Sequence, residues 1–209
     1  MDARIRLFLK RIIPSKKLFY LSLFLLSLGI ISGAIFLVVI NQNDKLVVID
    51  EINTFISNIN TNNFNSLESL KTSLINNSIY LIIIFILSMS IIGILLNIFI
   101  TYIKGFILGF SITSLIYTHG IKGILSATIY IFPHQLLNIF SILLIFTYSL
   151  ILTKYIILFF KGKKDINIKL FLKKYFYILL ITLFIILIST LIESFITPAL
   201  FKLVIKLFI

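Results

Sequence analysis

The stretch IYIFPHQLLNIFS, residues 129–141, decides how the rest of this chain is interpreted. It lies inside a long apolar run and carries Pro133, His134, Gln135 and Asn138. In hydrocarbon each polar group must find a protein partner or a wet cavity. Proline also removes a backbone donor and opens the helical hydrogen-bond ladder. We therefore expect this segment to pack inside a bundle of membrane-spanning helices that gather around it.

The composition predicts an all-α integral membrane protein. Of the 209 residues, 60% are hydrophobic and the mean hydropathy is +1.15, whereas soluble domains are roughly 45–50% apolar. The net charge of +12 does not indicate nucleic-acid binding, because the lysines flank apolar runs and form no single basic face. The chain has no cysteine, which rules out disulfides, thiol nucleophiles and cysteine metal sites.

The first predicted span follows a basic N-terminal flank. Residues 1–17 hold six Lys or Arg residues, with apolar residues at helical spacing that suit a membrane surface. Residues 18–40 carry no charge and are long enough to cross a bilayer. A signal peptide is disfavoured, because the apolar core is too long and no small-residue cleavage site follows. Gly29 and Gly33 form a small-xxx-small face suited to close helix packing.

Residues 41–77 form the one sizeable polar segment and are predicted to be an extracytoplasmic loop. Two short amphipathic helices fit its apolar spacing, at Ile49, Ile52, Ile56 and Ile59 and then at Leu67, Leu70 and Leu74. They would lie on the membrane or against a partner. A solvated loop with fraying helices is the alternative that the spacing leaves open.

Residues 79–118 are long enough for two spans, with a turn predicted around residues 93–98. Lys104 would then lie about two turns along the next helix, where its side chain can snorkel to the interface. Gly105 and Gly109 form a second small-xxx-small face. The glycine-containing segment 118–123 is predicted to be another turn.

Residues 124–160 would make a helix of roughly 55 Å, which is too long for one straight span. Pro133 provides the break: either one kinked helix crosses, or residues 124–132 form a re-entrant dip before a full span. His134 is the one histidine in this apolar region and has no cysteine or second histidine near it. We therefore expect no metal site and no cofactor, and expect His134 to hydrogen-bond inside the bundle.

The last predicted span, residues 175–196, follows a strongly basic loop. Residues 154–174 carry seven lysines, the span contains Glu193, and Thr197-Pro198 is expected to end it before a short amphipathic tail. The distribution of Lys and Arg places the flank 1–17 and the loop 154–174 in the cytoplasm. The predicted fold is therefore one polytopic domain over residues 1–209 with five transmembrane helices, N-in and C-out. Glu193 would lie near the outer interface.

No catalytic or nucleotide-binding motif is present in the sequence, so we expect a protein that is not an enzyme. A small transporter or ABC-type permease subunit is an alternative, motivated by the polar run 133–138 together with Lys104 and Glu193. A lipid-handling protein that grips anionic head groups with the 154–174 loop is a third interpretation.

Five motifs in order resemble one known family. They are LGIISGA at 28–34, Asn76-Asn77, IKGFILGF at 103–110, Phe132-Pro133-His134-Gln135, and IESFITPAL at 192–200, which includes Glu193 and Pro198. Their order and spacing resemble stage II sporulation protein M of endospore-forming bacteria, over nearly the whole chain. Asn138 departs from that pattern, because many wider-family members carry glutamate there. This departure suggests a packing or hydrogen-bonding role at that position.

The resemblance implies a membrane scaffold for endospore engulfment on the mother-cell side of the sporulation septum. It also implies recruitment of stage II sporulation proteins P and D, which degrade peptidoglycan. We expect segment 41–77 to contact these partners, so that deleting residues 49–74 abolishes recruitment. We also expect partner spans to be able to pack on the Gly29/Gly33 or Gly105/Gly109 faces.

Overall fold

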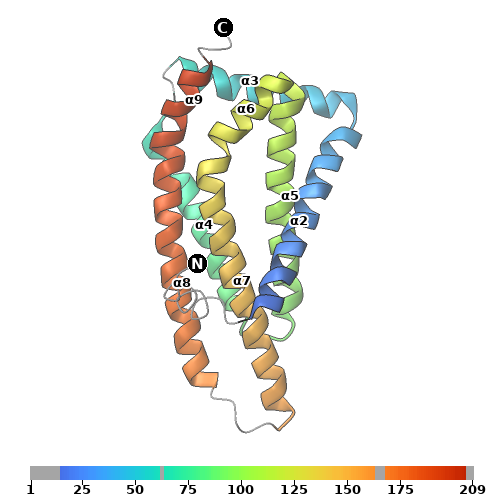
Figure 1. Ribbon diagram of the computed structural model, residues 1–209, viewed down its shortest axis with the longest axis vertical. Coiled ribbons are helices and arrows are strands. Elements are labelled where there is room, and N and C mark those ends of the chain that lie inside the picture. The colour runs from blue at the N-terminus through green and yellow to red at the C-terminus, as the bar shows by residue number, and fades with distance from the viewer. Residues whose placement is uncertain (1–14, 62–63, 163–167, 206–209) are drawn as a thin grey trace, which may run out of the picture.

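The computed structural model describes residues 15–61, 64–162 and 168–205, and every regular element within them is helical. Five helices are long and apolar enough to cross a membrane, which confirms the predicted polytopic all-α class. They are α2 (Lys16–Val39), α4 (Ser66–Leu87), α5 (Gly93–His119), α7 (Phe132–Phe160) and α8 (Ile168–Leu191) with its continuation to Lys202. Figure 1 shows them side by side, alternating in direction. Most of the predicted surface helix, residues 1–14, lies outside the described residues.

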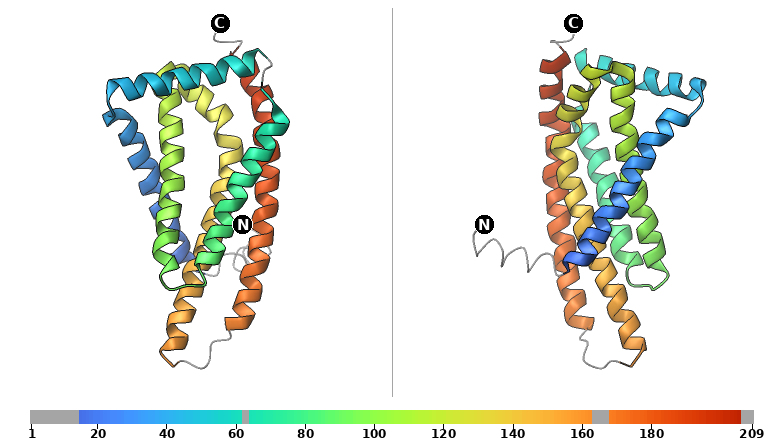
Figure 2. Two further views of the ribbon diagram at one scale, coloured as in Figure 1. Left: turned by 180° about the vertical axis from the view of Figure 1, so that it is seen from behind. Right: turned by 45° about the vertical axis from the view of Figure 1, so that its right-hand side comes forward.

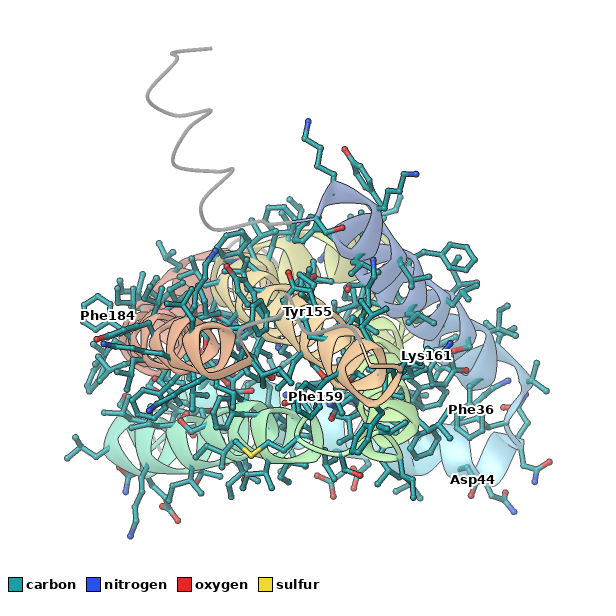
Figure 3. All side chains as sticks on the ribbon, turned by 90° about the horizontal axis from the view of Figure 1, so that it is seen from below. Phe36, Asp44, Tyr155, Phe159, Lys161 and Phe184 are labelled. Carbon is teal, nitrogen blue, oxygen red and sulfur yellow. The ribbon has the colours of Figure 1, made fainter. Side chains whose placement is uncertain are left out.

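The two ends of the bundle differ in what they carry. The start of α2, the end of α7 and the start of α8 lie at one end, which we call the lysine-rich end. The helices α3 (Gln42–Asn60), α6 (Ile121–Tyr130) and α9 (Thr197–Ile205) lie at the other, which we call the α3 end (Figure 1). Figure 3, seen from the lysine-rich end, shows Phe159 and Lys161 at the near end of α7. This arrangement matches the predicted grouping of loops, but the predicted loop 154–174 is too long, because α7 runs to Phe160 and α8 already begins at Ile168. Which end faces the cytoplasm stays a prediction.

Helix α7 forms the centre of the bundle. Its residues 141–149 are all buried. Tyr148 stacks on Tyr175 of α8 with ring centroids 6.1 Å apart. Asn97 of α5 donates to Ser149 Oγ of α7 at 2.7 Å and to the Ile84 carbonyl of α4 at 3.1 Å. Aromatic contacts and buried hydrogen bonds thus hold the neighbouring spans around α7, as the polar stretch within it suggested.

The two glycine faces predicted from sequence pack against each other. A Cβ on Gly33 would lie 2.0 Å from the Phe106 carbonyl oxygen, and one on Gly109 would lie 2.0 Å from the Ile30 carbonyl oxygen. Gly29 and Gly105 are equally close to the opposite backbone. These contacts leave no room for a side chain, so α2 and α5 meet backbone to backbone. The expectation that partner spans use these faces is therefore wrong, because the chain fills both faces itself.

Helix α3 lies across the α3 end of the bundle, against α5 and α9 (Figure 1). Its predicted apolar stripe faces inward: Ile59 is fully buried, and Ile49, Ile52 and Ile56 are partly buried. The second predicted amphipathic helix does not form separately. Residues 66–77 are instead the first turns of the span α4, which the Asn65 side chain caps through the Leu67 and Glu68 amides.

The turn between α4 and α5 falls at residues 88–92, so the predicted position at 93–98 is wrong. Ser88 Oγ donates to the Phe85 carbonyl, and the Ser90 amide donates to the Leu87 carbonyl at 3.0 Å. These bonds satisfy backbone groups that a turn would otherwise leave open in an apolar setting. Gly93 starts α5, where a Cβ would lie 1.8 Å from the Leu87 carbonyl oxygen. Ser88 and Ser90 lie within this turn and form its hydrogen bonds, whereas Gly93 already belongs to α5.

Pro133 marks a kink in one long crossing. Helix α6 ends at Tyr130 and α7 begins at Phe132, with Ile131 between them in the right-handed helical region. Pro133 occupies the first turn of α7, where its missing donor costs least. Both helices descend from the α3 end, after a turn at Gly120 with φ of 58°. Of the two alternatives, the structure has the kinked helix and no re-entrant dip.

The last span does not end at Thr197-Pro198, contrary to the prediction. A short π-helical turn, η1 (Ile192–Ile196), follows α8, and the chain continues as α9. The Thr197 amide donates five residues back to the Ile192 carbonyl. Pro198 then falls in the first turn of α9, where a proline is tolerated. The wider π-helical turn accommodates Pro198, so the helix continues and the span does not end there.

Candidate functional site

Lys104 lies inside the bundle and is held by α4. Its Nζ donates to Asn77 Oδ1 at 2.9 Å and sits 4.0 Å from the centre of the Tyr80 ring. Asn77 and Tyr80 are three residues apart and so share a face of α4. Because α5 begins at Gly93, Lys104 is roughly 16 Å along that helix. Snorkelling to the interface is therefore wrong for Lys104, since a hydrogen bond and a cation–π contact hold it inside.

Glu193 contacts the same face of α4. Its Oε1 accepts from Ser73 Oγ at 2.9 Å, and Ser194 Oγ lies 3.4 Å from Ser69 Oγ. Ser69, Ser73 and Asn77 follow one another at four-residue spacing and line up along the helix. Glu193 Oε2 is buried and has no hydrogen-bond partner among the described residues. The carboxylate and the Lys104 ammonium attract each other across this space.

Glu193 contacts α4 from within a π-helical turn. A π turn widens the helix by one residue and rotates the side chains that follow it. Here it spans Ile192–Ile196, with Glu193 in its first half. Such turns occur often at functional sites. The predicted acid near an interface is thus part of a polar cluster, which we define as Ser73, Asn77, Lys104, Gln135 and Glu193.

Two hollows meet at this cluster, and Lys104, Gln135 and Glu193 line both. The first, which we call the α3 cavity, has a volume of about 510 Å³ and lies between α3, α5, α6, α7 and η1. Its walls are largely apolar, with Ile52 and Phe55 contributed by α3. The second, which we call the α4 cleft, has a volume of about 640 Å³ and lies between α4, α5, α7 and η1. Both volumes fall in the range of binding pockets.

The two residues that follow Pro133 lie in different surroundings. Gln135 reaches the polar cluster, whereas the His134 ring is buried at the edge of the α3 cavity, 3% exposed. The His134 ring packs edge-on against the Tyr130 ring, with ring centroids 6.1 Å apart. The backbone carbonyl of His134 accepts a hydrogen bond from Ser189 Oγ at 2.7 Å. His134 Nδ1 has no partner among the described residues. The bond from Ser189 is to the His134 backbone, so hydrogen bonding by the His134 side chain inside the bundle stays a prediction.

Asn138 lies one turn beyond the cluster on α7. It is 2% exposed, and neither atom of its amide has a partner within the described part of the chain. It lines neither the α3 cavity nor the α4 cleft. The structure therefore does not bring Asn138 into the site. The glycine pairs also lie outside it, since they form the contact between α2 and α5.

The cluster combines one ammonium, one carboxylate, two amides and a hydroxyl, all within the span region. In the absence of bulk water, such groups bind strongly to complementary polar groups. Among the residues that the structure describes, no three His, Asp or Glu side chains converge as they would to hold a metal ion. The arrangement therefore supports non-covalent binding of a polar group inside the membrane.

Sequence reasoning found Lys104, Gln135 and Glu193 but missed Ser73 and Tyr80. Ser73 is not singled out because residues 41–77 are predicted to be a loop outside the membrane, and Tyr80 is not singled out because aromatic residues are common in apolar spans. The signal was nevertheless present, because Ser69, Ser73 and Asn77 recur every four residues directly before an apolar run. That spacing indicates one polar stripe on a helix.

The chain matches the family model described as Stage II sporulation protein M over residues 22–198. This range includes every member of the polar cluster and both glycine pairs. No curated protein and no solved structure shows significant similarity to the chain.

Proposed function

The chain belongs to the stage II sporulation protein M family, and from this premise we propose that it is a non-enzymatic membrane scaffold for endospore engulfment. Family membership makes it a sporulation-related protein, and its five apolar helices make it a multi-pass membrane protein. In the proposed role it recruits stage II sporulation proteins P and D, the peptidoglycan-degrading enzymes, on the mother-cell side of the septum.

The observation that carries the scaffold proposal is the outward face of α3. Asp50, Asn53, Thr54 and Ser57 are exposed and recur at helical spacing, while the isoleucines of the opposite face pack inward. The helix lies across the α3 end, away from the lysine-rich end (Figure 1). An amphipathic helix held in this way can present these polar side chains to a partner outside the membrane.

Point substitutions test this surface better than the deletion of residues 49–74 does. Because α4 begins at Ser66, that deletion also removes the turns that carry Ser69 and Ser73. The double variant Asp50→Lys, Thr54→Lys places two cations on the outward face and leaves the inward face intact. We expect pull-down from sporulating cells to recover at least about tenfold less of proteins P and D, which corresponds to about 1.4 kcal/mol of binding free energy.

The matched control is Asp50→Asn, Thr54→Ser, which keeps the outward face polar and adds no positive charge. It should recover both hydrolases at the level of the unmodified chain. Membrane insertion of each variant is checked by carbonate extraction of the membranes. Full recovery of both hydrolases with the charge-reversed variant would reject α3 as the recruiting surface.

A small transporter or ABC-type permease subunit is the second candidate, favoured by the α3 cavity that reaches Lys104 and Glu193. A transporter needs water access at that depth. Gln135 is the informative position for cysteine labelling, because it lines both hollows while His134 and Asn138 are buried by packing. Maleimide labelling of Gln135→Cys in intact cells, with co-purification of an ATPase in place of wall enzymes, would replace the scaffold proposal.

A further inference from the structure

We infer that the α4 cleft receives a transmembrane helix of another membrane protein, which places an amide or hydroxyl side chain against Lys104 and Glu193. This contact lies within the membrane and is separate from the α3 surface. It does not depend on proteins P and D being the partners.

The α4 cleft lies between the spans α4 and α5, with residues of α7 and η1 also lining it. In the left panel of Figure 2, α4 and α5 diverge from the turn that joins them toward the α3 end. The cleft is lined on the α4 side by Asn77, Tyr80 and Ile83 and at its floor by Lys104, Gln135 and Glu193. On its rim, Ile79 is 46% exposed and Ile83 is 39% exposed. These apolar residues suit contact with a second helix.

The floor of the cleft retains unused hydrogen-bonding capacity. Glu193 Oε2 has no partner among the described residues. The Lys104 ammonium has three donor hydrogens; one bonds to Asn77, and the group also faces the Tyr80 ring. Polar groups left incomplete in hydrocarbon are costly, so a bound group that completes them gains free energy. An amide or hydroxyl fits, because it can donate to Glu193 and accept from Lys104 at once.

The depth of the cluster favours a helix over a lipid. Lys104 is roughly 22 Å of helix away from the end of α5 at His119. Lipid head groups stay in the interfacial region, outside a hydrocarbon core of roughly 30 Å. A side chain on a spanning helix reaches this depth with no cost of moving a head group into hydrocarbon. Interhelical hydrogen bonds of this kind are a recognised source of association in membranes.

Photocrosslinking in sporulating cells tests the inference. Benzoylphenylalanine at position 83 lies on the rim of the cleft, and at position 184 it serves as a control. Phe184 is exposed on α8 and points outward at the edge of the bundle in Figure 3. We expect adducts at position 83 that mass spectrometry maps to a membrane-spanning segment of another protein, with a polar residue within one turn of the attachment point. Position 184 should not yield that adduct.

Two variants connect the adduct to the polar floor. Gln135→Leu removes a polar side chain that lines the cleft beside Lys104 and Glu193, while the Lys104–Asn77 and Ser73–Glu193 hydrogen bonds stay in place. Glu193→Gln keeps an acceptor for Ser73. Each should lower the adduct yield at position 83 by about threefold or more, the scale of one interhelical hydrogen bond. Leu136→Ala, on an exposed part of α7, should leave the yield unchanged.

Four results would overturn the inference. They are adducts at position 83 with lipid alone, adducts with a second copy of this chain, an unchanged yield in both Gln135→Leu and Glu193→Gln, and labelling of Ile83→Cys by a water-soluble maleimide in intact cells. The last result would mean that the α4 cleft is filled with water.

Discussion

Asn77 is the residue through which α4 holds the Lys104 ammonium. Its amide oxygen accepts at 2.9 Å, whereas the adjacent Asn76 is exposed. A hydrogen bond to a charged group contributes about 1.5–3 kcal/mol, and its loss leaves an ammonium without its acceptor. Substituting Asn77 therefore tests the hydrogen bond to Lys104. The same substitution at the adjacent, exposed Asn76 is a control, because it removes the same side chain without removing that bond.

We expect Asn77→Leu to lower the free energy of unfolding by about 1.5–3 kcal/mol and Asn76→Leu to change it by less than about 0.5 kcal/mol. The purified chain in detergent is heated in steps, and the fraction that still elutes as a monodisperse species is measured by size-exclusion chromatography. Equal melting temperatures for the two variants would mean that the Lys104–Asn77 bond does not stabilise the fold.

The residues of the site were more predictable than their partners. Lys104, Gln135 and Glu193 stand out in sequence because charged or amide groups are rare in apolar runs. The contact of Glu193 with Ser73 could not be predicted, because the sequence predicts a loop at Ser73 and gives no sign of the π-helical turn that carries Glu193. The sequence predicts an interfacial Lys104 because it places the turn at residues 93–98, whereas α5 begins at Gly93 and Lys104 lies deeper.

At the scale of elements, the contact between α2 and α5 depends on its glycines. A Cβ on Gly109 would lie 2.0 Å from the Ile30 carbonyl oxygen, so even the smallest side chain must move backbone. The same contact allows Tyr102 to donate to Ser32 Oγ at 2.7 Å across the two helices. Separating the helices therefore loses packing and this hydrogen bond together.

We expect Gly109→Val to lower the free energy of unfolding by about 1–3 kcal/mol or more, the usual cost of overpacking. Ile107→Ala, at an exposed position on the same helix, is the matched control and should have a small effect. Resistance of the detergent-purified chain to trypsin reports both. If Gly109→Val digests no faster than Ile107→Ala, the close approach of α2 and α5 is not needed for stability.

The lengths of the apolar runs were enough to predict which segments form membrane-spanning helices, but not where several of these helices begin or end. A membrane-spanning helix is recognised in sequence by a long run of apolar residues, and for this reason the sequence predicts all five spans. The sequence predicts the start of the second span too late, because the first turns of α4 are polar, and the end of the last span too early, because Thr197-Pro198 is a typical helix end. At the start of α4, Asn65 caps the helix and Asn77 bonds to Lys104, so its polar groups are satisfied. At the end of α8, the π-helical turn accommodates Pro198.

At the scale of the whole molecule, charge separates the two ends of the bundle. Of the seven lysines within residues 154–174, Lys154 lies near the end of α7, and Lys169, Lys173 and Lys174 lie in the first turns of α8. Lys16 and Lys17 begin α2 at the same end. The α3 end carries the exposed acids Asp44, Asp50 and Glu51 on α3. Positive charge is retained in the cytoplasm during insertion, so this asymmetry predicts the lysine-rich end inside and the α3 end outside.

Single cysteines in this cysteine-free chain test that orientation directly. Asn58→Cys lies on the exposed side of α3, and Lys161→Cys lies at the end of α7, where Figure 3 labels Lys161. In intact cells, a membrane-impermeant maleimide should label position 58 and leave position 161 unlabelled until the cells are opened. The reverse pattern would place α3 in the cytoplasm. It would then remove the scaffold surface from the side where peptidoglycan is degraded, because no wall-facing partner could reach it.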